Sequence, residues 1–222
     1  MNKRFRTFLA LLMLGALLSA CSSTPEKDTT VGTAGAIASA TAEFAKAAKA
    51  AGGVEVSIGG ERVLVASDFS AFDIAPDTAL HYIVVERVPY IDASLNGDSQ
   101  YVEGTSENLT KMGVDPKDMA KSIAKLEVLM KLPSTASSWI GAATNISAIS
   151  NRTTRMTVPV EKIDGAKDAG FPDVISLFFK LDEEGSLVQW GVFEKSGQTI
   201  STEQFTKVSI EKPSKTIDPP SR

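Results

Sequence analysis

The position of the only cysteine, Cys21, most constrains what this chain of 222 residues can fold into. Cys21 follows a basic head, made by Lys3, Arg4 and Arg6, and the 13-residue apolar run Phe8–Ala20. This order is typical of a secretory signal peptide, and the run is shorter than the roughly 20 apolar residues that a membrane-spanning helix needs. Because no cysteine follows, we expect an exported domain that is held together by its hydrophobic core, without disulfides.

The segment Leu18–Cys21 resembles the lipobox of bacterial lipoproteins. The resemblance implies that residues 1–20 are a lipoprotein signal peptide, that the chain is cut before Cys21, and that the Cys21 thiol carries acyl chains such as palmitate. We therefore expect a protein that is lipid-anchored to the cell membrane and faces the extracytoplasmic side. The alternative is a plain secretory signal in which the cysteine is incidental.

The charge balance bears on the partners of the mature chain. Three of the 23 Lys and Arg residues and none of the 27 Asp and Glu residues precede Cys21, so the rest of the chain has a net charge of −7. Nucleic-acid binding depends on a basic surface that neutralises phosphates, so nucleic acid is not an expected partner. Attachment to a membrane then has to come from acyl chains and not from a polybasic patch.

Shifts in composition divide the chain into four parts. After the signal peptide, residues 21–33 are polar and lack an apolar period, which predicts a flexible tether from acylated Cys21. Residues 34–213 are long enough to form a single domain with a sizeable core. Residues 214–222 include Pro219 and Pro220 and predict a disordered tail.

Hydrophobic periodicity predicts an α+β domain. One helix is expected over 35–51, with Thr33 as its cap, because the segment is rich in Ala and has a 3.6-residue apolar period. A central helix is expected over 115–132, where Asp115 is suited to the N-cap and Pro116 to the first helical position. Period-two segments separated by turn residues predict antiparallel meanders on both sides of the central helix. The predicted strands cover 54–58, 61–69, 80–86, 90–95, 100–103, 145–149, 156–163, 174–181, 187–194 and 199–210.

The order of these elements is similar to that of the LppX/LprAFG lipoproteins of actinobacteria, which share the LolA/LolB-like fold. Phe171-Pro172 leads into a strand, Asp182 and Gly185 form an Asp-x-x-Gly turn, and the segment 207–213 closes the domain as it does in that family. The likeness covers roughly residues 34–213.

One departure from the family concerns the early hairpins. Members commonly carry a Trp after the strand that contains Tyr, whereas Tyr90 is followed here by Asp98-Ser99-Gln100-Tyr101. The strand register over residues 88–104 therefore stays open.

The resemblance implies a curved antiparallel sheet, a half-barrel, wrapped around helices with an apolar cavity between them. It also implies that the cavity binds the acyl chains of a lipid or glycolipid and that the protein helps to transfer them across the envelope. The walls expected from the spacing are the apolar faces of three strands and of the central helix. They comprise Val63, Val65, Phe69, Leu80, Tyr82, Val84, Met119, Ile123, Leu126, Met130, Ile175, Leu177 and Phe179.

On spacing alone a packed core is the more common arrangement, and only the family resemblance makes a ligand wall as well supported, so a second function stays open. In that case the protein is a non-enzymatic envelope protein that binds another envelope protein, such as an exporter. The helical stripe of Met119, Ile123, Leu126 and Met130 does not separate the two, although the flexible thioether of Met suits variable acyl shapes.

Catalytic and metal chemistry find little support in the sequence. His81 is the only histidine and lies in a predicted strand, which favours a structural role. No Gly-x-Ser-x-Gly motif is present, and no glycine-rich phosphate loop follows a strand. With one histidine and an acylated cysteine, a zinc site is not expected. We therefore expect no enzyme activity, no metal and no cofactor.

The lipobox interpretation predicts the behaviour of a Cys21→Ala variant. Without the thiol, diacylation and cleavage before residue 21 are expected to fail, so the variant should migrate as an unprocessed or soluble species. Gel mobility and membrane fractionation measure this. Unchanged mobility together with unchanged membrane association would exclude Cys21 as the anchor.

Overall fold

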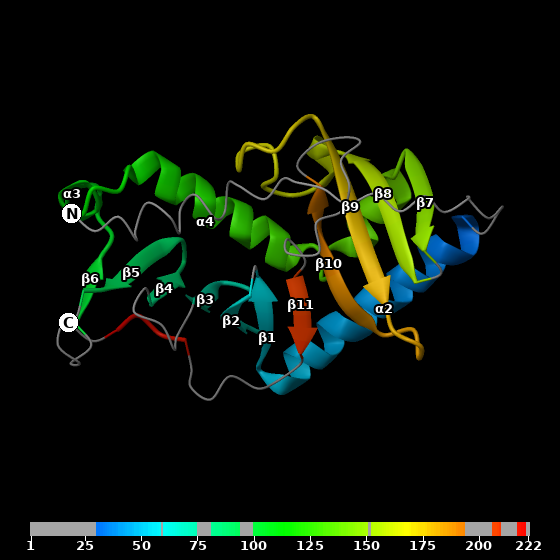
Figure 1. Cartoon of the computed structure of the whole chain (residues 1–222), viewed down its shortest axis with the longest axis horizontal. Coiled ribbons are helices and arrows are strands. Elements are labelled where there is room, and N and C mark those ends of the chain that lie inside the picture. Colours follow the sequence, from blue (N-terminus) through cyan, green and yellow to red (C-terminus); the bar gives the residue numbers. More distant parts are fainter. Residues whose placement is uncertain are drawn as a thin grey trace.

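The computed structural model describes residues 30–58, 60–74, 81–93, 100–150, 152–193, 206–209 and 217–220. Cys21, the predicted signal peptide and Leu80 lie outside these ranges. The described chain is α+β: its strands form one antiparallel sheet that does not close into a barrel, and the helices pack on this sheet (Figure 1).

Two meanders build the sheet, one before and one after the central helices. The first contains β1 (Gly53–Ile58), β2 (Glu61–Ala66), β3 (Ala71–Ile74), β4 (Tyr82–Val85), β5 (Val88–Asp92) and β6 (Tyr101–Glu103). The second contains β7 (Asn145–Ser150), β8 (Thr153–Pro159), β9 (Val174–Leu181), β10 (Leu187–Phe193) and β11 (Thr206–Ser209).

The last strand joins the two meanders. β11 pairs with β1, with Val208 opposite Val56, and with β10 on its other side. The strand order is therefore β6-β5-β4-β3-β2-β1-β11-β10-β9-β8-β7, which leaves β6 and β7 as the edges of the described sheet. The core depends on contacts between chain segments that are far apart in sequence.

The helices differ in how closely they approach the sheet. They are α2 (Thr30–Ala51), α3 (Ser106–Lys111), α4 (Pro116–Lys131) and α5 (Ala136–Trp139), with short 3₁₀ turns at Ile140–Ala142 and Val160–Lys162. α2 lies close on β1, β7, β9 and β10, whereas α4 makes fewer close backbone contacts with each of the strands. The buried face of α2 contains the small residues Ala40 and Ala48, whereas α4 buries the longer side chains of Met119 and Met130.

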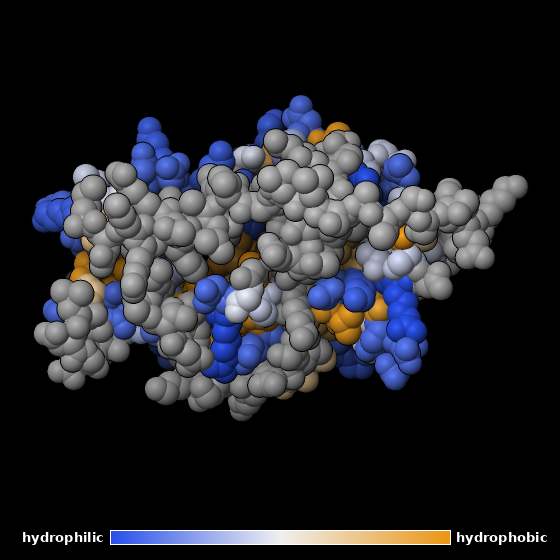
Figure 2. All heavy atoms as spheres, in the orientation of Figure 1, coloured by the Kyte–Doolittle hydropathy of each residue, from blue (hydrophilic) through white to orange (hydrophobic). Residues whose placement is uncertain are grey.

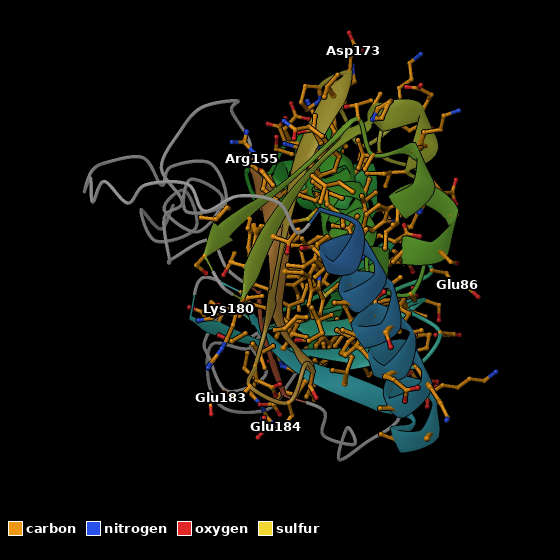
Figure 3. All side chains as sticks on the ribbon, turned by 90° about the vertical axis from the view of Figure 1, so that its right-hand side faces the viewer. Glu86, Arg155, Asp173, Lys180, Glu183 and Glu184 are labelled. Carbon is orange, nitrogen blue, oxygen red and sulfur yellow. The ribbon has the colours of Figure 1, made fainter. Side chains whose placement is uncertain are left out.

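Side-chain alternation explains which face of the sheet is buried. In β8, Thr154, Met156 and Val158 are buried and the residues between them are half-buried. Their strand partners in β9 are Phe179, Leu177 and Ile175, so both sets lie on the same face. The opposite face carries Arg155 and Lys180, which lie away from α2 in Figure 3.

Trp190 is the residue at which the sheet and two helices meet. Its side chain is fully buried, and its ring centroid lies 5.2 Å from that of Phe44 on α2. Its indole Nε1 donates a hydrogen bond of 2.7 Å to the carbonyl oxygen of Leu129 on α4. In an α-helix that carbonyl would accept from the amide four residues later, but Pro133 has no N–H. The indole thus replaces a hydrogen bond that the sequence of α4 cannot provide.

Several predicted elements are confirmed. The central helix begins where expected, because the Asp115 carboxylate accepts a 2.8 Å hydrogen bond from the amide of Lys117 and Pro116 is the first helical residue. The hairpin of β1 and β2 is confirmed, and the segment after residue 100 pairs back onto β5 as β6. The pairing of β6 with β5, in which Ile91 lies opposite Val102, establishes the strand register that the sequence left open.

Other predictions need correction. α2 begins at Thr30, so Thr33 lies in its first turn instead of capping it, because β-branched residues and glycine oppose a helix by less than about 1 kcal/mol each. Phe69 does not extend the strand of Val63 and Val65. β2 ends at Ala66, and Phe69 sits in the following turn with a φ of 59° while its side chain is still buried.

The strand β3 and the helices α3 and α5 were not predicted. β3 has only four residues and follows its turn directly, so its alternation is too short to stand out. α3 has six residues and is capped by Thr105, whose hydroxyl accepts from the amide of Asn108. α5 has four residues, which is too short for a helical period to be recognised.

The hydrogen bond of Trp190 predicts that Trp190→Phe destabilises the fold by more than the loss of side-chain volume alone would. Trp190→Phe keeps an aromatic ring but leaves the buried Leu129 carbonyl without its donor, so we expect a loss of about 2–4 kcal/mol in the free energy of unfolding. Trp139→Phe is the matched control, since Trp139 is equally buried but donates a longer, 3.3 Å bond to the hydroxyl of Thr135. Urea denaturation followed by far-ultraviolet circular dichroism measures both. Equal losses in the two variants would contradict a special role for the Trp190 hydrogen bond.

Candidate functional site

The residues expected to form the cavity wall come together in the structure. All except Leu80, which lies outside the described residues, belong to one hydrophobic cluster or pack against it. Tyr82 and Leu126 are half-buried, and the others are buried. The sequence therefore identified residues that share one interior, and that interior lies between the sheet and the helices.

Strand register aligns the wall within the first meander. Val65 of β2 lies opposite Phe72 of β3, and Phe72 lies opposite Val84 of β4, so the three side chains share the face that is covered by the helices. Tyr82 lies on the same face two residues before Val84. Burial raises the pKa of Tyr82 to about 12.

In the second meander the wall is completed by aromatic packing. The ring of Phe179 stacks on that of Trp139, with 5.6 Å between centroids and 23° between planes. Ile175, Leu177 and Phe179 are all at most 1% exposed. In this half of the molecule the wall residues are tightly enclosed by α2, α5 and the sheet.

A pocket of about 180 Å³ opens at the side of the first meander. Its floor is Phe72, whose side chain belongs to the buried cluster. The pocket lies where the turns after β2 and β4 face α4. The residues that line it are Ser70, Phe72, Glu86, Arg87, Glu127 and Lys131. It thus has an apolar floor and a charged rim, but it is smaller than the roughly 300–1,000 Å³ of typical small-molecule pockets.

Charged groups at this rim connect the β4–β5 hairpin to α4. Glu127 accepts hydrogen bonds of 2.6 Å from Arg87 Nε and of 2.6 Å from Lys131 Nζ. Burial alone would raise the pKa of Glu127, but the hydrogen bonds and charges of Arg87 and Lys131 outweigh it, and the pKa is lowered. The same hydrogen bond raises the pKa of Arg87. The carboxylate is therefore held in its ionised form.

The hairpin that presents Arg87 has an unusual backbone. Glu86 and Arg87 form its two-residue turn, with φ angles of 49° and 69°. Turns of this kind match the twist of a hairpin but favour Gly or Asn, since other side chains strain in the left-handed region. The ion pair of Arg87 with Glu127 stabilises a turn that its own residues do not favour.

A second polar cluster lies on the opposite face of the sheet. Asp73 alternates with Phe72, so its carboxylate points away from the helices, and its Oδ1 lies 2.5 Å from His81 Nε2. The hydroxyl of Tyr101 lies 2.8 Å from His81 Nδ1, and the two rings meet edge to face. Burial, followed by the charges of Asp92 and Asp73, raises the pKa of Tyr101. The carboxylate of Asp73, the imidazole of His81 and the phenol of Tyr101 thus form one hydrogen-bonded chain.

The sequence did not predict this cluster. His81 was interpreted as a structural strand residue, and its hydrogen bonds to partners from β3 and β6 fit that interpretation. The only available signal was the outward position of Asp73 and Tyr101 in alternating strands, which does not specify the register between them. The cluster connects β3, the residue before β4, and β6 on the sheet's outer face, with β5 lying between β4 and β6.

Comparison of the chain with protein-family models and with curated proteins gave no match. Among the described residues, His, Cys, Asp and Glu do not gather in threes or more in a way that could hold a metal ion. Within the same ranges, none of the helices combines the length and the apolar character needed to cross a membrane.

The charged rim predicts a stability that depends on pH. Since the pKa of Glu127 is lowered in the fold, its stabilising effect is present above the ordinary value of 4.5 and is lost as the pH falls below it. Glu127→Gln should therefore unfold more easily at pH 7, by about 1 kcal/mol, and should lose less stability than the parent between pH 5 and pH 3. Urea denaturation across this range measures both effects.

Glu107→Gln is the matched control for this prediction. Glu107 pairs with Lys111 at 2.6 Å, but both side chains are largely exposed, so removal of this charge should change stability little. If the two variants behave alike at every pH, the rim ion pairs do not stabilise the contact between the hairpin and α4.

Proposed function

We propose that this protein is a membrane-anchored lipoprotein of the cell envelope that binds the acyl chains of a lipid or glycolipid and helps to transfer them across the envelope. Acylated Cys21 is its anchor, and its sheet is a LolA-like half-barrel. The observation that carries the proposal is the apolar face of the open sheet, which α4 covers at a greater distance than α2.

The face of α4 that meets the sheet is suited to such a ligand. Met119, Ile123 and Met130 project from it into the cluster and are at most 6% exposed. Unbranched Met side chains adapt to irregular shapes more easily than β-branched ones. The backbone of α4 makes few close contacts with the strands. A change in the conformation of these side chains therefore creates space without breaking hydrogen bonds between strands.

The polar rim gives this space an entrance. The pocket beside Phe72 leads from solvent toward the cluster, and its charged lining suits the polar end of a lipid while the chain lies inside. In Figure 2, hydrophobic residues are visible between hydrophilic ones in the middle of this view of the molecule.

The free energy gained by burying an acyl chain indicates how much of the chain must be enclosed. Each buried methylene group contributes ~0.8 kcal/mol, so a dozen contribute on the order of 10 kcal/mol against association costs of roughly 4–15 kcal/mol. A pocket of about 180 Å³ does not enclose a chain of that length. Binding therefore requires α4 and its side chains to rearrange relative to the first meander.

A second candidate function rests on the tight packing of the second meander. Ile175, Leu177 and Phe179 are at most 1% exposed and leave little space for a ligand. If the core is packed throughout, the protein is a non-enzymatic envelope protein that binds another envelope protein, such as an exporter, through its surface. The lipid experiment distinguishes the two functions.

Native mass spectrometry tests the proposal directly. The chain lacking residues 1–21 should carry copurifying lipid and, after delipidation, should take up a fluorescent fatty-acyl probe. Bare polypeptide together with absent uptake would favour the interaction protein.

A variant that fills the expected space makes the test specific. Ala124 is half-buried on α4 and packs against the cluster, so Ala124→Trp should occupy room that an acyl chain needs. We expect near-parental melting of the delipidated protein together with loss of probe uptake. In a packed core the same change costs about 1–3 kcal/mol or more in stability. Lys180→Trp, on the exposed outer face of β9, is the control that should change neither property.

A further inference from the structure

The two edges of the sheet differ in their chemistry. β7 is a six-residue edge strand, and its sequence Asn-Ile-Ser-Ala-Ile-Ser contains no charge and no proline. At the other edge, β6 has three residues and ends on Glu103. Native proteins usually protect edge strands by shortness, charge or proline, because the unpaired N–H and C=O groups can bind another strand. β6 is protected because it is short and carries a charge, whereas β7 is longer and has neither a charge nor a proline.

The side chains of β7 are accessible. Asn145, Ala148, Ile149 and Ser150 are exposed, and Ile149, at 41%, is one of two large apolar residues with high exposure among those the structure describes. Within those same ranges, no strand pairs with the outer side of β7. A register shift between Ala148 and Ser150 bends the end of the strand, so its first four residues are the most regular part.

We propose that β7 is the contact surface for a second copy of this chain, and that the two β7 strands pair antiparallel about a two-fold axis. With the axis at Ser147, Ser147 of one copy lies opposite Ser147 of the other, and Ile146 lies opposite Ala148. Opposed residues then share a face, as an antiparallel ladder requires. Every opposed pair is uncharged, so the strand meets itself without repulsion.

The structure favours a second copy paired in this way over a head-to-tail arrangement of copies. A head-to-tail contact would have to join β7 to β6, which provides only three residues and carries Glu103. A two-fold contact uses the neutral strand twice and closes after two copies. α2 lies close to β7, and within its residues 33–40 the exposed positions are Gly35, Ala36 and Ser39, so no long exposed side chain of this stretch obstructs the approach.

Cross-linking in the full chain tests the proposal. Ser147→Cys adds one thiol to a chain whose only other cysteine is Cys21, so the parent chain reports any reaction of Cys21 itself. Directly opposed residues of an antiparallel pair have Cβ atoms about 4.5–5.5 Å apart, within reach of a mild oxidant or a short bis-maleimide. We expect a cross-linked species of twice the chain mass in Ser147→Cys and none above the parent level in Lys180→Cys. In the proposed pair, the two Lys180 positions are five strand spacings apart across the sheet, about 24 Å, and are further offset along the strands, so they lie beyond the reach of these reagents.

A charge placed on the strand should abolish the contact. Ala148 is exposed, so Ala148→Lys in the Ser147→Cys chain is expected to keep the fold, as melting can verify, and to lose both the cross-link and the dimer mass in sedimentation equilibrium of the detergent-solubilised chain. Absence of the double-mass species in Ser147→Cys would overturn the proposal. So would its persistence after Ala148→Lys, or an adduct with a different protein in place of a second copy.

Discussion

The hydrogen bond from the Trp190 indole to the Leu129 carbonyl connects the two halves of this fold. Leu129 lies near the end of α4, where Pro133 cannot supply the amide that would normally complete the helix. Trp190 comes from β10, 61 residues away in sequence, and its ring also contacts Phe44 of α2. A helix end that would otherwise bury an unsatisfied carbonyl is thereby fixed to the second meander, and the position of α4 over the sheet follows from this contact.

The two helices cover the sheet differently. α2 buries Ile37 and Phe44 together with Ala40 and Ala48, and it lies close on strands of the second meander. α4 buries Met119, Ile123 and Met130, makes fewer close backbone contacts with the strands, and is connected to the first meander by an ion pair at its outer margin. The ion pair of Glu127 with Arg87 connects α4 to a hairpin whose turn is strained at Glu86 and Arg87, and Lys131 of the same helix also binds Glu127. This asymmetry supports the proposal that an acyl chain binds under α4.

The outer face of the sheet shows a complementary arrangement. Asp73, His81 and Tyr101 link three segments of the first meander by hydrogen bonds, on the side that the helices do not cover. In the second meander, Phe178 lies over Gly191, where a Cβ atom would come within 2.4 Å of the aromatic ring. The first meander is thus reinforced by polar groups, and the second by close aromatic packing on both faces of β9.

The sequence by itself determined the elements whose signals are local. Asp115 and Pro116 set the start of α4, and period-two alternation located β1, β2, β9 and β10, whose apolar positions proved to share one interior. The strand predicted over 156–163 was only partly right, because β8 spans Thr153–Pro159 and a 3₁₀ turn follows at Val160–Lys162. Short elements such as β3 and α3 were not predicted, because a hydrophobic period cannot be recognised over four to six residues. Only the tertiary structure decided which strands are edges, that Trp190 completes α4, and that His81 meets Asp73 and Tyr101. Each of these depends on register between segments distant in sequence, and register is set by the packing of all strands together, which no local pattern contains.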